Sequence, residues 1–374
     1  MYLQKINLVN FRNYGKQEIA FHPELNIFYG ANAQGKTNLL EAIYYLAVTR
    51  SFRTSQDAEL IKRGEQYFFL RGRFARKKSD SVVQVEIGYR GSQRIQVKLN
   101  GVPAKRIEVA NLLPVVVFSP EDLLLIKEGP GRRRRFINLE GSRLRKVYYR
   151  DLKEYQRALM QRNRLLKENK GLEVKEELFE PWNKVLCNYG SRIIRQRLSL
   201  LKSLEREAIP FFQYLTSQKE ELSLRYISSF PLPPEDGKMD EHFLKSLQGR
   251  YGEERRRGYT LVGPHLDDFE ILINGAEAQK YASQGQQRSA VLALKMAEVK
   301  LFNAYYGESP LVLLDDVFSE LDGERKRHLL QHLEQMEAQV FITGVELPRY
   351  FKGEAKIFQV NEGMISNEGN WGDH

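Results

Sequence analysis

An eight-residue segment near the N-terminus constrains the fold of this chain more than any other feature of its sequence. It matches the P-loop pattern G-x-x-x-x-G-K-[ST] at every position and reads Gly30-Ala31-Asn32-Ala33-Gln34-Gly35-Lys36-Thr37. Residues 25–29 before it predict a short buried strand, and residues 38–47 after it carry apolar side chains at helical spacing. A glycine-rich structural turn is the alternative, and the strand–loop–helix context argues against it.

The chemistry of a P-loop follows from its backbone. The glycines let N–H groups close around phosphate oxygens, and the following helix N-terminus adds partial positive charge. We expect Lys36 to bridge the β- and γ-phosphates and the Thr37 hydroxyl to bind Mg²⁺. ATP and Mg²⁺ are therefore the expected cofactors.

The second half of this chemistry is expected in residues 311–316, where four apolar residues precede two acids. This pattern predicts a buried parallel strand that ends in carboxylates, at the sheet edge where open α/β sheets bind ligands. We expect Asp315 to hold Mg²⁺, directly or through another ligand of the metal, and Asp316 to polarise the attacking water. The candidate catalytic residues are Lys36, Asp315 and Asp316.

Composition limits the class of protein. The chain has 374 residues, enough for two or three packed units, and its one cysteine, Cys187, excludes an intrachain disulfide. No apolar run approaches the roughly 18 residues of a membrane span, so we expect a cytoplasmic protein without a membrane partner. The net charge of +10 favours a polyanionic partner, although charge alone does not choose between nucleic acid, acidic lipid and solubility.

The most basic stretch is residues 127–150, with nine Lys or Arg residues against two Glu. Two interpretations stay open: a solvated start of a helix, and a face that contacts DNA phosphates. Four consecutive arginines cannot all point one way on a helix, so some are expected to pair with acids. The candidate DNA contacts are Arg132, Arg133, Arg134, Arg135, Arg143, Arg145 and Lys146.

Periodicity organises the rest of the chain. Residues 67–99 alternate with period two, which predicts antiparallel sheet, and residues 144–207 carry two helical stripes joined by a loop that contains Gly171. We expect an α/β fold with a mixed sheet, an antiparallel β subdomain and an inserted helical lobe too short for a long coiled coil. The expected divisions are 1–130 and 258–374 for the two halves of the head, and 131–257 for the lobe.

Two further segments are candidate nucleotide contacts. Residues 282–288 form a polar, glycine-containing turn before the helix expected at 289–305, which is typical of an anion site, although such a turn is also a common loop. Residues 11–14 are either an ordinary hairpin tip or a base or phosphate contact, because the next strand leads into the P-loop. The candidate residues are Arg12, Asn13, Ser283, Gly285 and Gln286.

Together these motifs resemble the ABC-type ATPase heads of DNA-repair and chromosome-maintenance proteins, and more narrowly the RecF family of bacterial recombination and repair ATPases. The matching segments cover most of the chain: Asn10-Phe11-Arg12-Asn13-Tyr14, Gly30–Asn38, Thr49–Arg53, Phe118–Leu123, Gly263–Asp268, Ser283–Arg288 and Leu313–Asp322.

The resemblance implies roles that spacing alone does not. Ser283–Gln287 would be the signature motif, which completes the nucleotide site of the opposite subunit, so that two chains sandwich two ATP molecules. Ser283 would hydrogen-bond the γ-phosphate in trans, and Ser319–Asp322 would be the D-loop at the dimer seam. The family implies an ATP-dependent homodimer that binds duplex or gapped DNA, is released by slow, DNA-stimulated hydrolysis, and works with RecR and RecO to load recombinase at single-strand gaps.

The sequence also departs from the wider ABC pattern. Asp316 stands where glutamate is usual, and a misplacement of about 1 Å can cost on the order of 100-fold in rate, so slow hydrolysis is expected. Thr343 and Gly344 lie near the usual switch histidine, and Ser119–Asp122 lies near the Q-loop. A transporter subunit, a P-loop phosphotransferase and an ATP-binding scaffold without turnover are the alternatives. The basic lobe and missing histidine argue against the first, and Ser283–Arg288 against the second.

Overall fold

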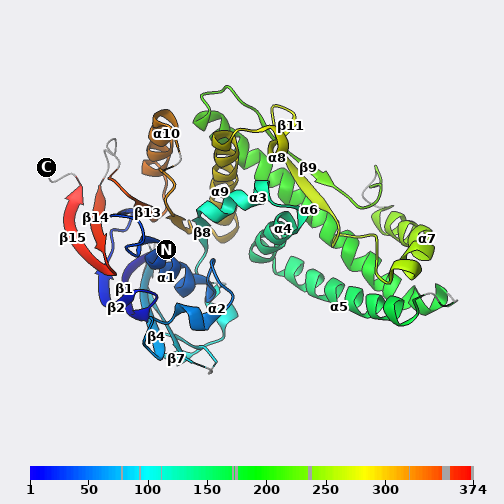
Figure 1. Cartoon of the computed structure of the whole chain (residues 1–374), viewed down its shortest axis with the longest axis horizontal. Coiled ribbons are helices and arrows are strands. Elements are labelled where there is room, and N and C mark those ends of the chain that lie inside the picture. The colour runs from blue at the N-terminus through cyan, green and yellow to red at the C-terminus, as the bar shows by residue number, and fades with distance from the viewer. Residues whose placement is uncertain are drawn as a thin grey trace. The chain divides into compact units, whose positions relative to one another are not determined.

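The computed structural model describes residues 1–76, 79–91, 94–110, 112–170, 172, 176–234, 238–319, 321–347 and 354–371 (Figure 1). Gly171 and Glu320, expected in the lobe loop and the D-loop, lie outside them. The chain forms two compact units. Unit 1 comprises Met1–Asp122, Tyr214–Ser217 and Lys295–His374, and unit 2 comprises Leu123–Gln213 and Gln218–Leu294.

Unit 1 contains a six-stranded mixed sheet in the order β15-β14-β3-β13-β12-β8. Its pairings are parallel except that of β15 with β14. The strands β12 and β13 are buried along their whole length and, except for Thr343 near the end of β13, carry no polar side chain, as expected of parallel strands covered on both faces. The strands are β3 (Leu25–Tyr29), β8 (Val115–Phe118), β12 (Leu311–Leu314), β13 (Val340–Gly344), β14 (Ala355–Asn361) and β15 (Met364–Trp371).

The second sheet of unit 1 is antiparallel, in the order β2-β1-β4-β5-β6-β7. Along β4, Phe68, Leu70 and Phe74 are buried, whereas Arg71 and Arg73 are exposed, so one face joins the core and the other meets solvent. The strands are β1 (Tyr2–Phe11), β2 (Tyr14–Ala20), β4 (Tyr67–Arg76), β5 (Ser79–Arg90), β6 (Gln96–Leu99) and β7 (Val102–Pro103).

Helix α1 (Lys36–Val48) joins the two sheets of unit 1 into one core. Leu39, Ile43 and Leu46 on this helix belong to the same buried cluster as Phe68 of the antiparallel sheet and Phe341 of the mixed sheet. The helix ends at Thr49, whose φ of 58° is left-handed. The other helical elements of unit 1 are η1 (Asp57–Leu60), α2 (Arg106–Ala110) and α10 (Gly323–Glu334).

Unit 2 is mainly helical. Helix α7 shows how local sequence sets its ends: Asp240 and Glu241 lie in its first turn, Arg255–Arg257 in its last, and Gly258 closes it in a left-handed conformation. Within the described residues the longest helix is α6, with 36 residues. The elements are α3 (Leu124–Lys127), α4 (Pro130–Leu144), α5 (Lys146–Glu168), η3 (Glu176–Phe179), α6 (Glu180–Leu215), β9 (Leu222–Ile227), α7 (Met239–Arg257), β10 (Asp268–Ile273), β11 (Ala276–Glu277) and α8 (Ala278–Tyr281).

The helical unit extends beyond the expected bounds of 131–257. It begins at Leu123 and continues to Leu294, because β10 pairs with β9 and carries Asp268, the partner of Arg133. Three described elements cross the boundaries between units. They are η2 (Pro120–Leu123), α6, whose last residues Tyr214 and Leu215 belong to unit 1, and α9 (Gln284–Tyr306), which starts in unit 2 and ends in unit 1. The segment Ser283–Gln287 therefore belongs to unit 2.

Candidate nucleotide-binding site

The phosphate loop needs glycine at two positions for steric as well as conformational reasons. Gly30 has φ 150° and Gly35 has φ 122°, and both are in the range that favours glycine. A Cβ on Gly30 would lie 2.3 Å from the Val360 carbonyl oxygen, and one on Gly35 would lie 2.6 Å from Asn13 Nδ2. The loop therefore packs closely against neighbouring segments of the chain.

Lys36 is buried in this loop, and its Nζ donates to the carbonyl oxygens of Gly30 at 2.6 Å and Ala31 at 2.7 Å. Burial lowers the pKa of Lys36, and the negative charges of Asp316 and Asp315 oppose that shift. The ammonium group is thus held within the loop, close enough to the acidic end of β12 to be influenced by its charge.

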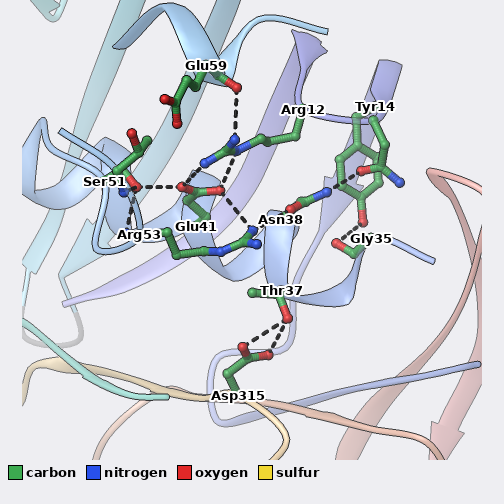
Figure 2. A network of polar contacts seen from close by, with 12 residues as sticks. Arg12, Tyr14, Gly35, Thr37, Asn38, Glu41, Ser51, Arg53, Glu59 and Asp315 are labelled. Atoms are coloured by element: carbon green, nitrogen blue, oxygen red, sulfur yellow. Dashed lines mark hydrogen bonds and ion pairs between the residues drawn. The ribbon is translucent and has the colours of Figure 1, made fainter. Parts of the chain in front are cut away.

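Thr37 and Asp315 meet although 278 positions separate them in the chain. The Thr37 hydroxyl lies 2.9 Å from each carboxylate oxygen of Asp315 (Figure 2). Burial raises the pKa of Asp315, and hydrogen bonds from Thr343 and Thr37 oppose that shift. A hydroxyl beside a carboxylate is the oxygen donor set that Mg²⁺ prefers, and Mg²⁺ takes its other ligands from phosphates and water. The described residues hold no group of three or more His, Cys, Asp or Glu arranged for a metal.

Asp316 adopts an unusual backbone conformation, with φ 51°. Its N–H donates to Thr343 Oγ1 at 2.9 Å, and the Thr343 hydroxyl in turn donates to Asp315 Oδ1 at 2.7 Å. Thr343 thus links the two acids. The sequence did not predict this contact, which depends on the pairing of β13 with β12.

The tip of the β1–β2 hairpin lies against the P-loop and α1. Arg12 donates to both carboxylate oxygens of Glu41, at 2.8 and 2.7 Å (Figure 2). Asn13 Nδ2 donates to the Gln34 carbonyl at 2.9 Å. Glu41 is fully buried on α1, and it also accepts a hydrogen bond from Ser51. No role for Glu41 was predicted from the sequence. Nucleotide contacts of Arg12 and Asn13 stay predictions.

In unit 2, Ser283 and Gln286 form a capping box at the start of α9. Ser283 N–H donates to Gln286 Oε1 at 2.8 Å, and Gln286 N–H donates to Ser283 Oγ at 3.3 Å. The S-x-x-Q spacing signalled this cap. Ser283 is exposed at the N-terminus of a 23-residue helix, where an anion is favoured. Contacts of Ser283, Gly285 and Gln286 with a γ-phosphate stay predictions.

The candidate DNA residues on and just after α4 differ in burial and in their partners. Arg133 is buried and donates to both oxygens of Asp268, at 2.8 and 2.7 Å. Arg134 donates to the Asp267 carbonyl at 3.1 Å, Arg132 pairs with Glu128, and Arg143 pairs with Glu140. The exposed members of the candidate DNA set are Arg132, Arg135, Arg145 and Lys146.

Sequence comparison matches residues 2–366 to the family model described as the RecF/RecN/SMC N terminal domain. The "DNA replication and repair protein RecF" of Clostridium tetani is 40% identical over 366 residues, covering 97% of this chain and 99% of the relative. The protein of the same name from Macrococcus caseolyticus is 41% identical over 373 residues, covering 98% of this chain and 100% of the relative.

Solved structures give the same result. The recombination mediator protein RecF with ATP, in the RecFOR pathway, superposes with a TM-score of 0.86 and 37% identity, covering 98% of each chain. The Smc head domain of Pyrococcus furiosus has a TM-score of 0.60 and 19% identity, covering 99% of this chain and 96% of that one, and shows the fold alone. The predicted ABC-type head is confirmed, and the residues that the structure describes contain no long coiled coil. In the described part of the chain, no helix has the length and apolar character to cross a bilayer.

Proposed function

The chain belongs to the RecF family of DNA replication and repair proteins, and from this membership we propose that it is an ATP-switched DNA-binding protein. ATP binds at the P-loop, two heads close around it, and the closed dimer holds DNA until slow hydrolysis opens it. The RecF relative whose structure contains ATP supports the nucleotide.

One observation carries the proposal: Thr37 and Asp315, from opposite ends of the chain, meet at 2.9 Å beside the buried Lys36. A structural glycine turn would not need a hydroxyl, a buried carboxylate and a buried ammonium at one place. Burying charged groups costs free energy, so their convergence favours a functional site.

The residues divide the work as follows. Backbone N–H groups of Gly30–Thr37 and the Lys36 ammonium bind and orient the phosphates. Thr37 and Asp315 hold Mg²⁺, which when bound neutralises negative charge on the phosphates. Asp316 orients the attacking water and accepts its proton, and Thr343 fixes the backbone from which Asp316 projects.

The second protomer would supply Ser283–Gln287 to the γ-phosphate. Ser283 is exposed at the start of α9, so a second copy of the chain could reach it. RecR and RecO as partners, recombinase loading at gapped DNA and a cytoplasmic location are part of the same proposal. The relative's association with the RecFOR pathway supports them.

Sedimentation equilibrium tests the proposal directly. With Mg²⁺ and a slowly hydrolysed ATP analogue the chain should dimerise, and Ser283→Ala should reduce dimerisation without loss of fold. ATP turnover measured in the same samples should rise when gapped DNA is added. A monomer at saturating nucleotide would contradict the sandwich, and turnover that ignores DNA would contradict the switch.

A further inference from the structure

Two hairpin turns from opposite ends of the chain bind the phosphate loop at one residue, Gln34. From the β1–β2 turn, Asn13 Nδ2 donates to the Gln34 carbonyl at 2.9 Å. From the β14–β15 turn, the Gly363 N–H donates to the same carbonyl at 3.0 Å. The Glu362 N–H donates to Gln34 Oε1 at 2.7 Å. The Gln34 carbonyl therefore accepts from both turns, and its side chain accepts from one.

The three segments pack so closely that two of their glycine positions have no room for a side chain. A Cβ on Gly363 would lie 2.6 Å from the Asn13 carbonyl oxygen, and one on Gly30 would lie 2.3 Å from the Val360 carbonyl oxygen. Gly363 is buried and has φ 73°, which also favours glycine. All three segments belong to unit 1.

These contacts affect phosphate binding because the peptide bond is planar. In a trans peptide the carbonyl and the following N–H point in opposite directions. Holding the Gln34 carbonyl toward the turns thus directs the Gly35 N–H to the other side of the loop. The Gly35 carbonyl accepts from the buried Tyr14 hydroxyl at 2.9 Å, which directs the Lys36 N–H in the same manner (Figure 2). P-loops bind phosphate through such N–H groups.

We propose that the β14–β15 turn is a working part of the nucleotide site. Together with the β1–β2 turn it holds the Gln34 and Gly35 carbonyls, and so aims the N–H groups of Gly35 and Lys36 at the phosphates. Gln34 and Gly363 are positioning residues, because they act through the loop. This inference rests on the proposed function, since it assumes that nucleotide binds at the P-loop.

A pair of glycine variants in one hairpin tests it. Gly363→Ala introduces a Cβ against Asn13, whereas Gly369→Ala introduces one on the neighbouring strand, where φ is also positive at 113° but nothing lies within 4 Å. The dissociation constant of a fluorescent ATP analogue with Mg²⁺, and thermal unfolding, are measured for both. We expect Gly363→Ala to weaken binding about tenfold, and Gly369→Ala less than about twofold, at comparable unfolding temperatures.

Gln34→Met supplies a variant without backbone strain. It keeps the length of the side chain but loses the acceptor for the Glu362 N–H, so we expect binding about threefold weaker with unchanged unfolding. If Gly363→Ala does not fold, this variant decides alone. Equal affinities of wild type and Gln34→Met, or equal weakening by Gly363→Ala and Gly369→Ala, would overturn the inference. A wild-type chain that does not bind the analogue would instead contradict the proposed function.

Discussion

The acidic end of β12 in unit 1 and the start of β10 in unit 2 each carry a largely buried aspartate, and the two aspartates have different partners. Asp315 accepts hydrogen bonds from two neutral hydroxyls, those of Thr37 and Thr343. Asp268 instead accepts both arms of the Arg133 guanidinium. A carboxylate held by neutral groups keeps its charge available for a cation, whereas one paired with arginine is already neutralised. The first arrangement indicates chemistry, and the second indicates structure.

We expect the largest effect from Asp315→Asn, which tests whether the Asp315 carboxylate takes part in ATP hydrolysis. Removing the charge beside Thr37 should lower ATP turnover by on the order of 100-fold to 1000-fold, as for other residues that stabilise transition-state charge. Stability should hold or rise, because burial of the Asp315 carboxylate is costly and raises its pKa. Steady-state phosphate release and thermal unfolding measure the two quantities. A variant that hydrolyses ATP normally would remove Asp315 from the site.

For the Arg133–Asp268 pair we expect the reverse outcome: Arg133→Ala should lower stability and leave turnover unchanged. The variant leaves Asp268 buried without its arginine partner, and breaking a buried pair costs about 3–5 kcal/mol of unfolding free energy. Turnover per folded molecule should stay near wild type. Urea unfolding measures the loss. Glu154→Gln is the matched control, because it breaks an exposed Arg157–Glu154 pair on α5 and should cost less than about 1 kcal/mol.

The same contrast explains what the sequence could predict. Local backbone geometry sets the P-loop, the strand before it and the acid pair after β12. Their sequence patterns therefore predicted these elements and also that the P-loop and the acids lie at the same edge of the sheet. The partner of Arg133 lies 135 positions away on a strand whose register no local pattern specifies. The contacts of Thr343 and the turn at Gly363 likewise depend on which strands become neighbours in the mixed sheet. Pairing of distant segments is tertiary information, and periodicity does not contain it.

Thr343→Val removes one of the two hydroxyls that contact Asp315 while keeping the shape of the side chain. The Asp316 N–H also loses its acceptor, so the acid that orients water should lose its fixed position. We expect kcat to fall about tenfold to 100-fold, as for a displacement of about 1 Å, with little change in KM. Thr343→Ser keeps the hydroxyl and should restore most of the rate. Equal rates for the valine and serine variants would show that the hydroxyl is not what positions Asp316.

We expect the smallest effect per residue from the exposed Lys and Arg residues of the candidate DNA set. Arg135, Arg145 and Lys146 are exposed, so we expect them, rather than Arg133, to contact phosphates. Replacing all three with glutamine should reduce the slope of log K against log salt by about 0.9 for each phosphate that the variant no longer neutralises. The fall in affinity should be equal for unrelated DNA sequences, because phosphate contacts carry no base information.

Fluorescence anisotropy at several salt concentrations, with ATP analogue present, measures this slope. Arg157→Gln with Arg164→Gln is the matched control, since both arginines are exposed on α5 and already pair with Glu154 and Glu168. Because those pairs satisfy the guanidinium groups, the control should leave the slope unchanged. If the triple variant also left the slope unchanged, Arg135, Arg145 and Lys146 would not contact DNA phosphates, and the DNA surface would lie elsewhere on the chain.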